Sequence, residues 1–456
     1  MKRLFVFFVV AFSAAVLTTN AFALDSSNVK FFGEIELTGY GRSNVDYLKG
    51  SDNVRGWSGV YQYAYVGVKL DVDPRLQVGV RALLTDGVWG SEQGAIDPAF
   101  DRTWLKYTIL DGDSLSWTIE GGILFGGDYT LHSDEWGWGF ASGFYEQSPA
   151  DSGSRNKFRT DVAFGDQSVY LAVEKGYETS LDKHDEKGYD NASDAYAVLL
   201  GANLKFDNLY VYPLVSYAVG YNYASSTDNL TSIDKNNSIL GAYLGIGYLP
   251  ENGLNARFAA AYTKSNDTKY TWDDGGTLTE ETEIGASVWG AYLNVSYVGE
   301  TSTIGVAGVY ASYDKDADAG FWFGMDFDMT SIIDNGFRDG SGVHSMTAAY
   351  LYGEHSLTDK LSLRAVAGYY TSNITGDKHG AALAVASNSP DNFIQLTKDT
   401  TAREVDIALG YKLYEDVTLE LGGGYAAFDK LWNQDDSVQY NSDPIYQGWL
   451  TLDVVF

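Results

Sequence analysis

The sequence predicts an all-β protein, a transmembrane antiparallel β-barrel of about 18 strands with short turns at one end and long loops at the other. Three observations carry this prediction: apolar and polar residues alternate along the chain, short and long connections alternate strictly, and charges fall on one face of the strands. A barrel of about 16 strands would follow if one hairpin were misread.

The alternation is clearest at the end of the chain. Every second residue back from Phe456 to Tyr446 is apolar or Gly, whereas the other face carries Gln447, Thr451 and Asp453. Side chains alternate across a strand, and about ten tilted residues cross a bilayer. A sheet edge cannot lie open in lipid, so this strand must close a barrel. By itself the segment fits an edge strand of a soluble sandwich equally well.

The same period recurs through the chain. The predicted strands are residues 30–42, 60–72, 74–84, 101–110, 114–125, 157–165, 167–176, 194–206, 208–222, 237–249, 253–265, 284–299, 301–314, 342–355, 359–371, 402–414, 417–429 and 444–456. A proline, Pro213, falls inside one of them, where we expect a bulge or lost pairing because proline has no N–H to donate.

The connections separate into two kinds. Short ones are turn sequences such as Asp111-Gly112-Asp113 and Gly165-Asp166-Gln167, which predict hairpins. They alternate with long polar stretches at 43–59, 85–100, 126–156, 177–193, 223–236, 266–283, 315–341, 372–401 and 430–443. Short periplasmic turns and long extracellular loops with an even strand count are the plan of outer-membrane barrels, and a soluble sandwich has no reason for such segregation.

Charges follow one parity of the strands. In residues 402–414, Val405, Ile407 and Leu409 alternate with Glu404 and Asp406. In residues 101–110, Leu105, Tyr107 and Ile109 are predicted to face lipid, opposite Arg102, Trp104 and Lys106. Since a basic residue on the lipid face costs about 2–4 kcal/mol near the midplane, this sorting predicts a wet lumen.

The beginning of the chain predicts export. Lys2 and Arg3 precede an apolar run from Leu4 to Leu17, and Ala21-Phe22-Ala23 forms a small-x-small cleavage site. Residues 1–23 are therefore predicted to be a signal peptide, and residues 24–456 a single barrel domain. The chain has no Cys, so it uses no disulfides, and its formal charge of −30 argues against nucleic acid as a partner.

The terminal Phe456 resembles the signal that the barrel-assembly machinery reads in Gram-negative outer-membrane proteins, and the layout of turns and loops resembles that of porins. The resemblance rests on architecture; no diagnostic porin motif is matched. It implies a bacterial outer-membrane, multi-pass, non-enzymatic channel for passive diffusion of small hydrophilic solutes and ions. It also implies contact with outer-membrane lipid and lipopolysaccharide, and leaves monomer and homotrimer open.

In porins the third loop folds into the barrel, and loop order alone transfers that feature to residues 126–156. The predicted constriction sets three acids on this loop against three bases on nearby strands, because opposed rows of charge set ion selectivity. These residues are Asp128, Asp134 and Glu135 on the loop and Arg81, Arg102 and Lys106 on the strands. Alternatively, the acids only cap turns and the loop packs over the mouth.

Other functions remain open. The aromatic residues Trp136, Trp138 and Phe140 could line a slide for sugars in a channel selective for sugars or organic ions, or could simply pack the loop. A third alternative is a structural or adhesive barrel plugged by its loops. No cofactor or specific metal site is predicted; the acidic run 314–320 departs from a calcium loop, which leaves only loose calcium binding at acidic loops.

Overall fold

The structure is a computed structural model. It describes residues 28–43, 57–88, 99–112, 114–125, 154–177, 195–219, 230–233, 238–274, 277–317, 319–321, 329–333, 345–375, 380–383, 394–433 and 438–456. The predicted signal peptide and residues 126–153 of the predicted third loop lie outside these residues, whereas residues 154–156 belong to a strand. No helix in the described ranges is long and apolar enough to cross a membrane.

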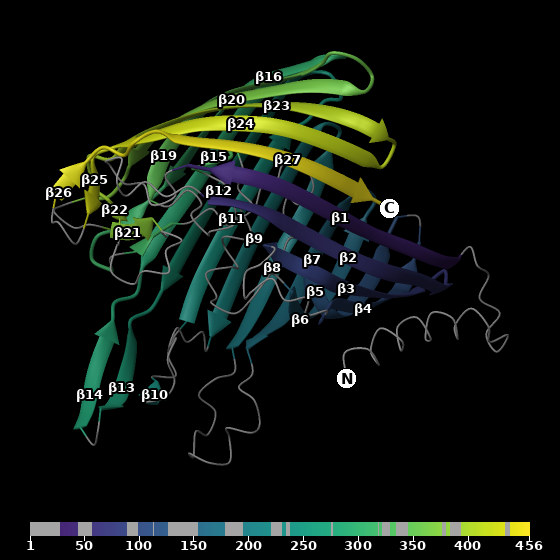
Figure 1. The fold of residues 1–456 in the computed structure, drawn as a ribbon. Coiled ribbons are helices and arrows are strands. Elements are labelled where there is room, and N and C mark those ends of the chain that lie inside the picture. The colour runs from purple at the N-terminus through teal and green to yellow at the C-terminus, as the bar shows by residue number, and fades with distance from the viewer. Residues whose placement is uncertain are drawn as a thin grey trace, which may run out of the picture.

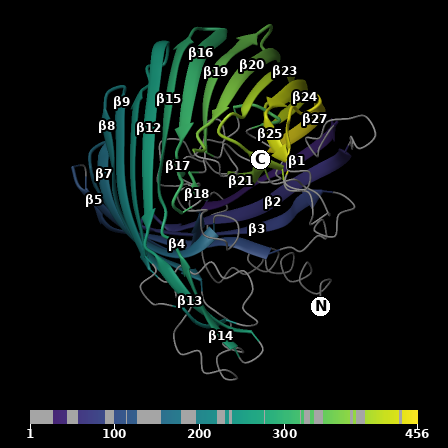
Figure 2. The ribbon, with the colours of Figure 1, turned by 90° about the vertical axis from the view of Figure 1, so that its left-hand side faces the viewer.

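Eighteen strands form one closed antiparallel sheet, in which each strand pairs with its neighbours in the barrel and the last pairs with the first (Figures 1 and 2). They are β1 (Val29–Arg42), β2 (Trp57–Asp73), β3 (Leu76–Val88), β4 (Ala99–Asp111), β5 (Ser116–Phe125), β6 (Ser154–Phe164), β7 (Gln167–Tyr177), β8 (Ala195–Phe206), β9 (Leu209–Val219), β11 (Ser238–Tyr248), β12 (Gly253–Ser265), β15 (Ser287–Val298), β16 (Ser302–Ala311), β19 (Met346–Ser356), β20 (Leu361–Ser372), β23 (Thr401–Tyr414), β24 (Val417–Asp429) and β27 (Ile445–Val455).

This count confirms the predicted barrel and excludes the smaller one. Every predicted strand is found, with ends shifted by a few residues. Hydrophobic alternation succeeds here because each strand has lipid on one side and the lumen on the other, which keeps the period of two over the whole strand.

The long connections contain structure of their own. β10 (Leu230–Ile233), β13 (Thr268–Asp274) and β14 (Thr277–Glu283) form a three-stranded sheet that extends beyond the end of the barrel (Figures 1 and 2). β17 (Tyr313–Asp314) pairs with β18 (Ala319–Gly320), and a four-stranded sheet joins β21 (Gly380–Leu383), β22 (Ile394–Leu396), β25 (Leu431–Asn433) and β26 (Val438–Tyr440). Apart from β17, which lies at the end of the predicted strand 301–314, all belong to connections predicted to be long, so the long-loop end is partly ordered by strand pairing.

Exposure along the strands confirms the predicted faces. In β23 the side chains of Val405 and Ile407 are 56% and 55% exposed, whereas those of Glu404 and Asp406 are 1% and 5% exposed. The outward face therefore carries the apolar residues that lipid would cover, and the acidic residues point to the interior.

The predicted face of Ile109 is wrong. The β4–β5 register shifts between Thr108 and Leu110, and it is Leu110 that is exposed, at 43%. A β-bulge inserts one extra residue and reverses the parity beyond it, which hydrophobic alternation alone cannot locate.

Pro213 interrupts a ladder, as predicted. The β8–β9 pairing stops at Gly201↔Leu214 and resumes at Leu204↔Val211, while Pro213 remains opposite Leu244 on the β11 side. The missing N–H thus costs pairing on one side of β9 only.

Phe456 completes the closure of the barrel. β1 and β27 pair from Glu34↔Val455 to Arg42↔Gln447. Beyond that ladder, Gly33 N donates to Phe456 O at 2.7 Å and Phe456 N donates to Gly33 O at 3.0 Å. The Phe456 ring covers Gly33, where an added Cβ would lie 2.5 Å from the ring and 2.7 Å from the backbone oxygen of Tyr65.

This contact predicts that Gly33→Val weakens barrel closure, because the new side chain collides with a backbone atom as well as with the ring. We expect a loss of about 1–3 kcal/mol, the usual cost of overpacking. Gly39→Val on the same outward face is the matched control, since its Cβ would approach nothing closer than Leu450 O at 3.9 Å. The measurement is the midpoint of heat-induced unfolding, followed by the shift in gel migration; equal midpoints for the two variants would contradict the prediction.

Candidate functional site

The inner wall carries an acidic side on four consecutive strands, β23, β24, β27 and β1. The strand parity that points apolar residues outward points the acids inward. They are Glu404, Asp406, Glu420, Asp453, Glu36 and Glu34. Glu36 and Asp453 are partners in the β1–β27 register, so two acids lie side by side at the seam where the barrel closes.

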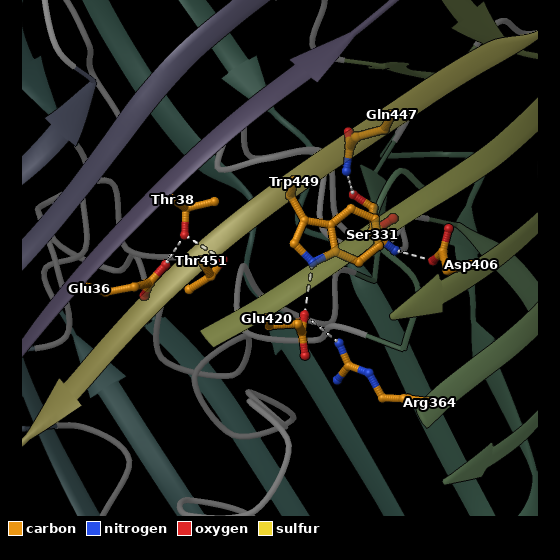
Figure 3. A network of polar contacts seen from close by, with 9 residues as sticks. All are labelled: Glu36, Thr38, Ser331, Arg364, Asp406, Glu420, Gln447, Trp449 and Thr451. Carbon is orange, nitrogen blue, oxygen red and sulfur yellow. Dashed lines mark hydrogen bonds and ion pairs between the residues drawn. The ribbon is translucent and has the colours of Figure 1, made fainter. Parts of the chain in front are cut away.

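Polar contacts order this side of the wall (Figure 3). Trp449 Nε1 donates to Glu420 Oε1 at 2.8 Å, and Arg364 Nη2 approaches the same oxygen at 3.3 Å. At the seam, Thr38 Oγ1 donates to Glu36 Oε1 at 2.8 Å and lies 2.8 Å from Thr451 Oγ1. Polar contacts within β1 and from β27 and β20 to β24 thus hold Glu36 and Glu420 in place.

The three predicted bases lie on the inner wall, on β3 and β4. Arg81 and Arg102 are partners in the β3–β4 register, and Lys106 is the partner of Glu120 in the β4–β5 register. The Arg81 guanidinium lies over the Tyr65 ring at 4.4 Å, and its residue is only 7% exposed. The sequence therefore places these bases on the correct face, and the barrel brings them together on adjacent strands.

The predicted partners of these bases lie outside the described residues. This applies to the acids Asp128, Asp134 and Glu135 and to the aromatic residues Trp136, Trp138 and Phe140. The third-loop constriction and the aromatic slide therefore stay predictions.

A different connection enters the lumen. Residues 329–333 of the β16–β19 connection, called the inward segment below, are bound to side chains on the luminal face of β23. Ile332 N and Ile333 N donate to Glu404 Oε1 and Oε2 at 2.5 and 2.7 Å, and Thr330 Oγ1 donates to Oε2 at 2.8 Å. Because Glu404 faces inward, the inward segment lies inside the barrel wall.

Contacts to β23, β27 and β20 complete the attachment, and Figure 3 shows the first two. Ser331 N donates to Asp406 Oδ2 on β23 at 2.7 Å, and Gln447 Nε2 on β27 donates to Ser331 O at 2.9 Å. The Thr330 hydroxyl also lies 2.7 Å from the Tyr370 hydroxyl on β20. Three consecutive backbone N–H groups and one carbonyl of the inward segment thus have partners on the wall.

Loop order predicts an inward fold for the third connection and gives no sign of this one. The usable signal was the apolar pair Ile332 and Ile333, both buried, within a connection otherwise counted as polar. The sequence pattern does not reveal the contact between Ile332 and Glu404, because these residues lie 72 positions apart and meet only once the barrel has formed.

The base of the same connection is held separately by Asp314. Its carboxylate accepts the backbone N–H of Ser287 at 2.9 Å, and those of Asp316 and Ala317 at 3.0 and 3.4 Å. The Ser287 bond above all, with help from the other two, holds the pKa of Asp314 below its usual value, because each stabilises the ionised form. Within the described ranges no group of three His, Cys, Asp or Glu residues could hold a metal ion.

A buried ion pair joins β6 and β7. Lys157 Nζ lies 2.6 Å from Glu174 Oε1, the two residues are partners in the β6–β7 register, and both side chains are 1% exposed. Their strand neighbours Phe158 and Val173 are exposed on the outer wall, so the pair lies on the inner side. A buried charge requires its partner, which makes the pair a structural element of this side of the wall.

No protein-family model matches the chain, and no curated protein matches its sequence. Solved structures do match. The outer membrane protein OprD from Pseudomonas aeruginosa is 11% identical with a TM-score of 0.51, over 93% of each chain. OccK8 (OprE) from the same organism is 10% identical with a TM-score of 0.50, over 94% of this chain and 98% of that one.

An anion-selective porin from Comamonas acidovorans is 12% identical with a TM-score of 0.44, over 94% of this chain and 99% of that one. The matches to the two Pseudomonas proteins span nearly the whole of both chains. The chain therefore has the fold of a bacterial outer-membrane β-barrel of the porin type.

The ion pair predicts an asymmetric response to mutation. Lys157→Met removes the cationic partner of the buried Glu174 carboxylate, and we expect a loss of about 3–5 kcal/mol in the free energy of unfolding. Lys157→Met combined with Glu174→Leu removes both charges and should cost less than the single change. Urea unfolding followed by tryptophan fluorescence measures both; a double variant less stable than the single one would contradict this assignment.

Proposed function

We propose that the protein is an outer-membrane channel that lets small hydrophilic solutes and ions diffuse passively through a water-filled lumen. One observation carries the proposal: the outer wall is apolar, whereas the inner wall carries charged side chains of both signs. An 18-stranded barrel is too wide for side chains to fill. Inward charges are stable there because water reaches the exposed ones, such as Lys106, and the buried ones, such as Glu404, are held by partners inside the wall.

Acidic and basic side chains occupy different parts of the inner wall. The acids of β23, β24, β27 and β1 lie on one side of β2, and the bases of β3 and β4 lie on the other. Because only β2 separates them, a solute near this part of the wall meets charges of both signs, which favours polar solutes over apolar ones. The acidic excess of the whole chain, −30, biases the channel toward cations.

Within this proposal the third loop contributes a narrowing through Asp128, Asp134 and Glu135, opposite Arg81, Arg102 and Lys106. The three bases on the inner wall support it. The protein performs no covalent chemistry and needs no cofactor, with calcium bound only loosely at acidic loops.

A selective channel for sugars or organic ions is the second candidate. An aromatic cluster on the inner side of β1, β2 and β4 favours it: the Phe32 ring lies 6.4 Å from the Tyr65 ring and 6.3 Å from the Trp104 ring. Aromatic faces with a cation nearby, here Arg81, suit such solutes. A plugged structural or adhesive barrel is the third candidate.

The proposal includes export and assembly. Residues 1–23 act as a cleaved signal peptide, and Phe456 presents the closing strand to the barrel-assembly machinery. Outer-membrane lipid and lipopolysaccharide then surround the apolar wall, whether as a monomer or a homotrimer.

The test is conductance of the folded barrel in a planar bilayer, with the reversal potential measured in a salt gradient. We expect steady current steps with a cation-favouring reversal potential. Arg81→Gln with Arg102→Gln should increase the preference for cations, and Glu36→Gln with Asp453→Asn should decrease it, because each pair removes charge from one side of the lumen.

The absence of conductance from a barrel with normal heat-modifiable migration would reject the channel and leave the plugged alternative. Addition of sugars separates the two channel candidates. Sugars that block the current at low concentration, with the block lost in Trp104→Ala, would favour the selective channel.

A further inference from the structure

We propose that Glu404 and Asp406 form a pH-sensitive latch, which holds the inward segment against the inner wall at neutral pH and releases it on acidification, so that the channel widens. The inference rests on the proposed channel function. It concerns the β16–β19 connection and is independent of the third loop.

Glu404 makes the contacts of an ionised carboxylate. Its two oxygens accept three donors, Ile332 N, Ile333 N and Thr330 Oγ1, at 2.5 to 2.8 Å. An ionised carboxylate only accepts hydrogen bonds, and bonds to a charged acceptor are the stronger kind. A proton on Oε1 would face the Ile332 N–H, and a proton on either oxygen would remove the charge that strengthens all three hydrogen bonds. Protonation of Glu404 therefore works directly against the attachment.

Asp406 has a carboxylate oxygen on which a proton displaces no donor. Its Oδ2 accepts a hydrogen bond from Ser331 N, but its Oδ1 is buried and has no hydrogen-bond partner in the described structure. Gln447 Oε1 is also buried without a hydrogen-bond partner in the described structure. Asp406 and Glu404 stand two residues apart on one face of β23, and neighbouring carboxylates resist being ionised together. A proton on Asp406 Oδ1 displaces no donor, whereas a proton on Glu404 weakens an acceptor of the inward segment and breaks the attachment.

Titratable and charged groups on the neighbouring strands surround Glu404 and Asp406. β20 contributes Tyr370, bonded to Thr330, and Arg364, which is bonded to Glu420 of β24. β19 contributes Tyr350, whose ring meets that of Tyr370 edge-on at 5.7 Å. Gln447 of β27 is uncharged, and its register partner Arg42 belongs to β1. No residue of the inward segment itself titrates, so the response comes from the wall.

The inward segment and the wall are tightly packed at Gly424, which is the register partner of both Asp406 and Gln447. A Cβ added there would lie 2.1 Å from Asp406 Oδ1 and 2.9 Å from Ser331 Oγ. A single methyl group would therefore push Asp406 and the inward segment apart without changing any charge. At the adjacent Gly423, which faces outward, a Cβ meets only Gln447 O at 3.4 Å.

The experiment is single-channel conductance of the full-length barrel, recorded between about pH 7 and pH 4, the range in which carboxyl groups titrate. We expect the wild-type conductance to rise about twofold as the inward segment leaves the wall. Glu404→Gln should show the high conductance at both pH values. Asp453→Asn, which also removes an inward acid, and Asp314→Asn, at the base of the connection, should both keep the pH step.

The uncharged pair of glycine variants makes the test independent of titration. Gly424→Ala should conduct at neutral pH as the wild type does in acid, and Gly423→Ala should match the wild type. Heat-modifiable migration first verifies that each variant is folded. A folded barrel that conducts, but with equal conductance in Gly424→Ala, Gly423→Ala and wild type, would overturn the latch. No conductance in any variant would overturn the proposed channel instead.

Discussion

The closed hydrogen-bond ladder is the constraint on which the rest of the structure depends. In hydrocarbon each unpaired backbone N–H or C=O costs several kcal/mol, so an open edge is excluded. The β1–β27 ladder and the reciprocal Gly33–Phe456 bonds join the two ends of the sheet. They join segments from opposite ends of the chain, so the barrel is complete only when the last strand is in place.

Closure in turn fixes what each side chain can do. A strand in a closed wall has lipid on one face and the lumen on the other. The register of β23 therefore decides both that Val405 and Ile407 are exposed and that Glu404 and Asp406 point inward. A shift by one residue would exchange the two sets and place two acids in lipid. The cost of that exchange keeps the register of β23 fixed, and with it the position of the acids that hold the inward segment.

The strands were predictable from the sequence, whereas the contacts that the connections make were not, for a physical reason. The alternation of apolar and polar residues in β23 or β27 can be read from the strand's own sequence, because all its residues face one of the same two environments, lipid or lumen. The bulge after Thr108 and the contact between Glu404 and Ile332 depend on partners elsewhere in the chain. The inner-wall position of Arg81, Arg102 and Lys106 followed from parity, whereas the inward position of residues 329–333 did not, since loop order carries no information about the partners of a connection.

The inward segment obeys the same constraint as the wall that holds it. A peptide pressed against the wall loses water on that side, so its backbone donors need acceptors, and three consecutive N–H groups find them in Glu404 and Asp406. Uncharged acceptors would hold the segment more weakly and at every pH. Carboxylates hold it strongly because they are charged, and for the same reason the attachment depends on their ionisation.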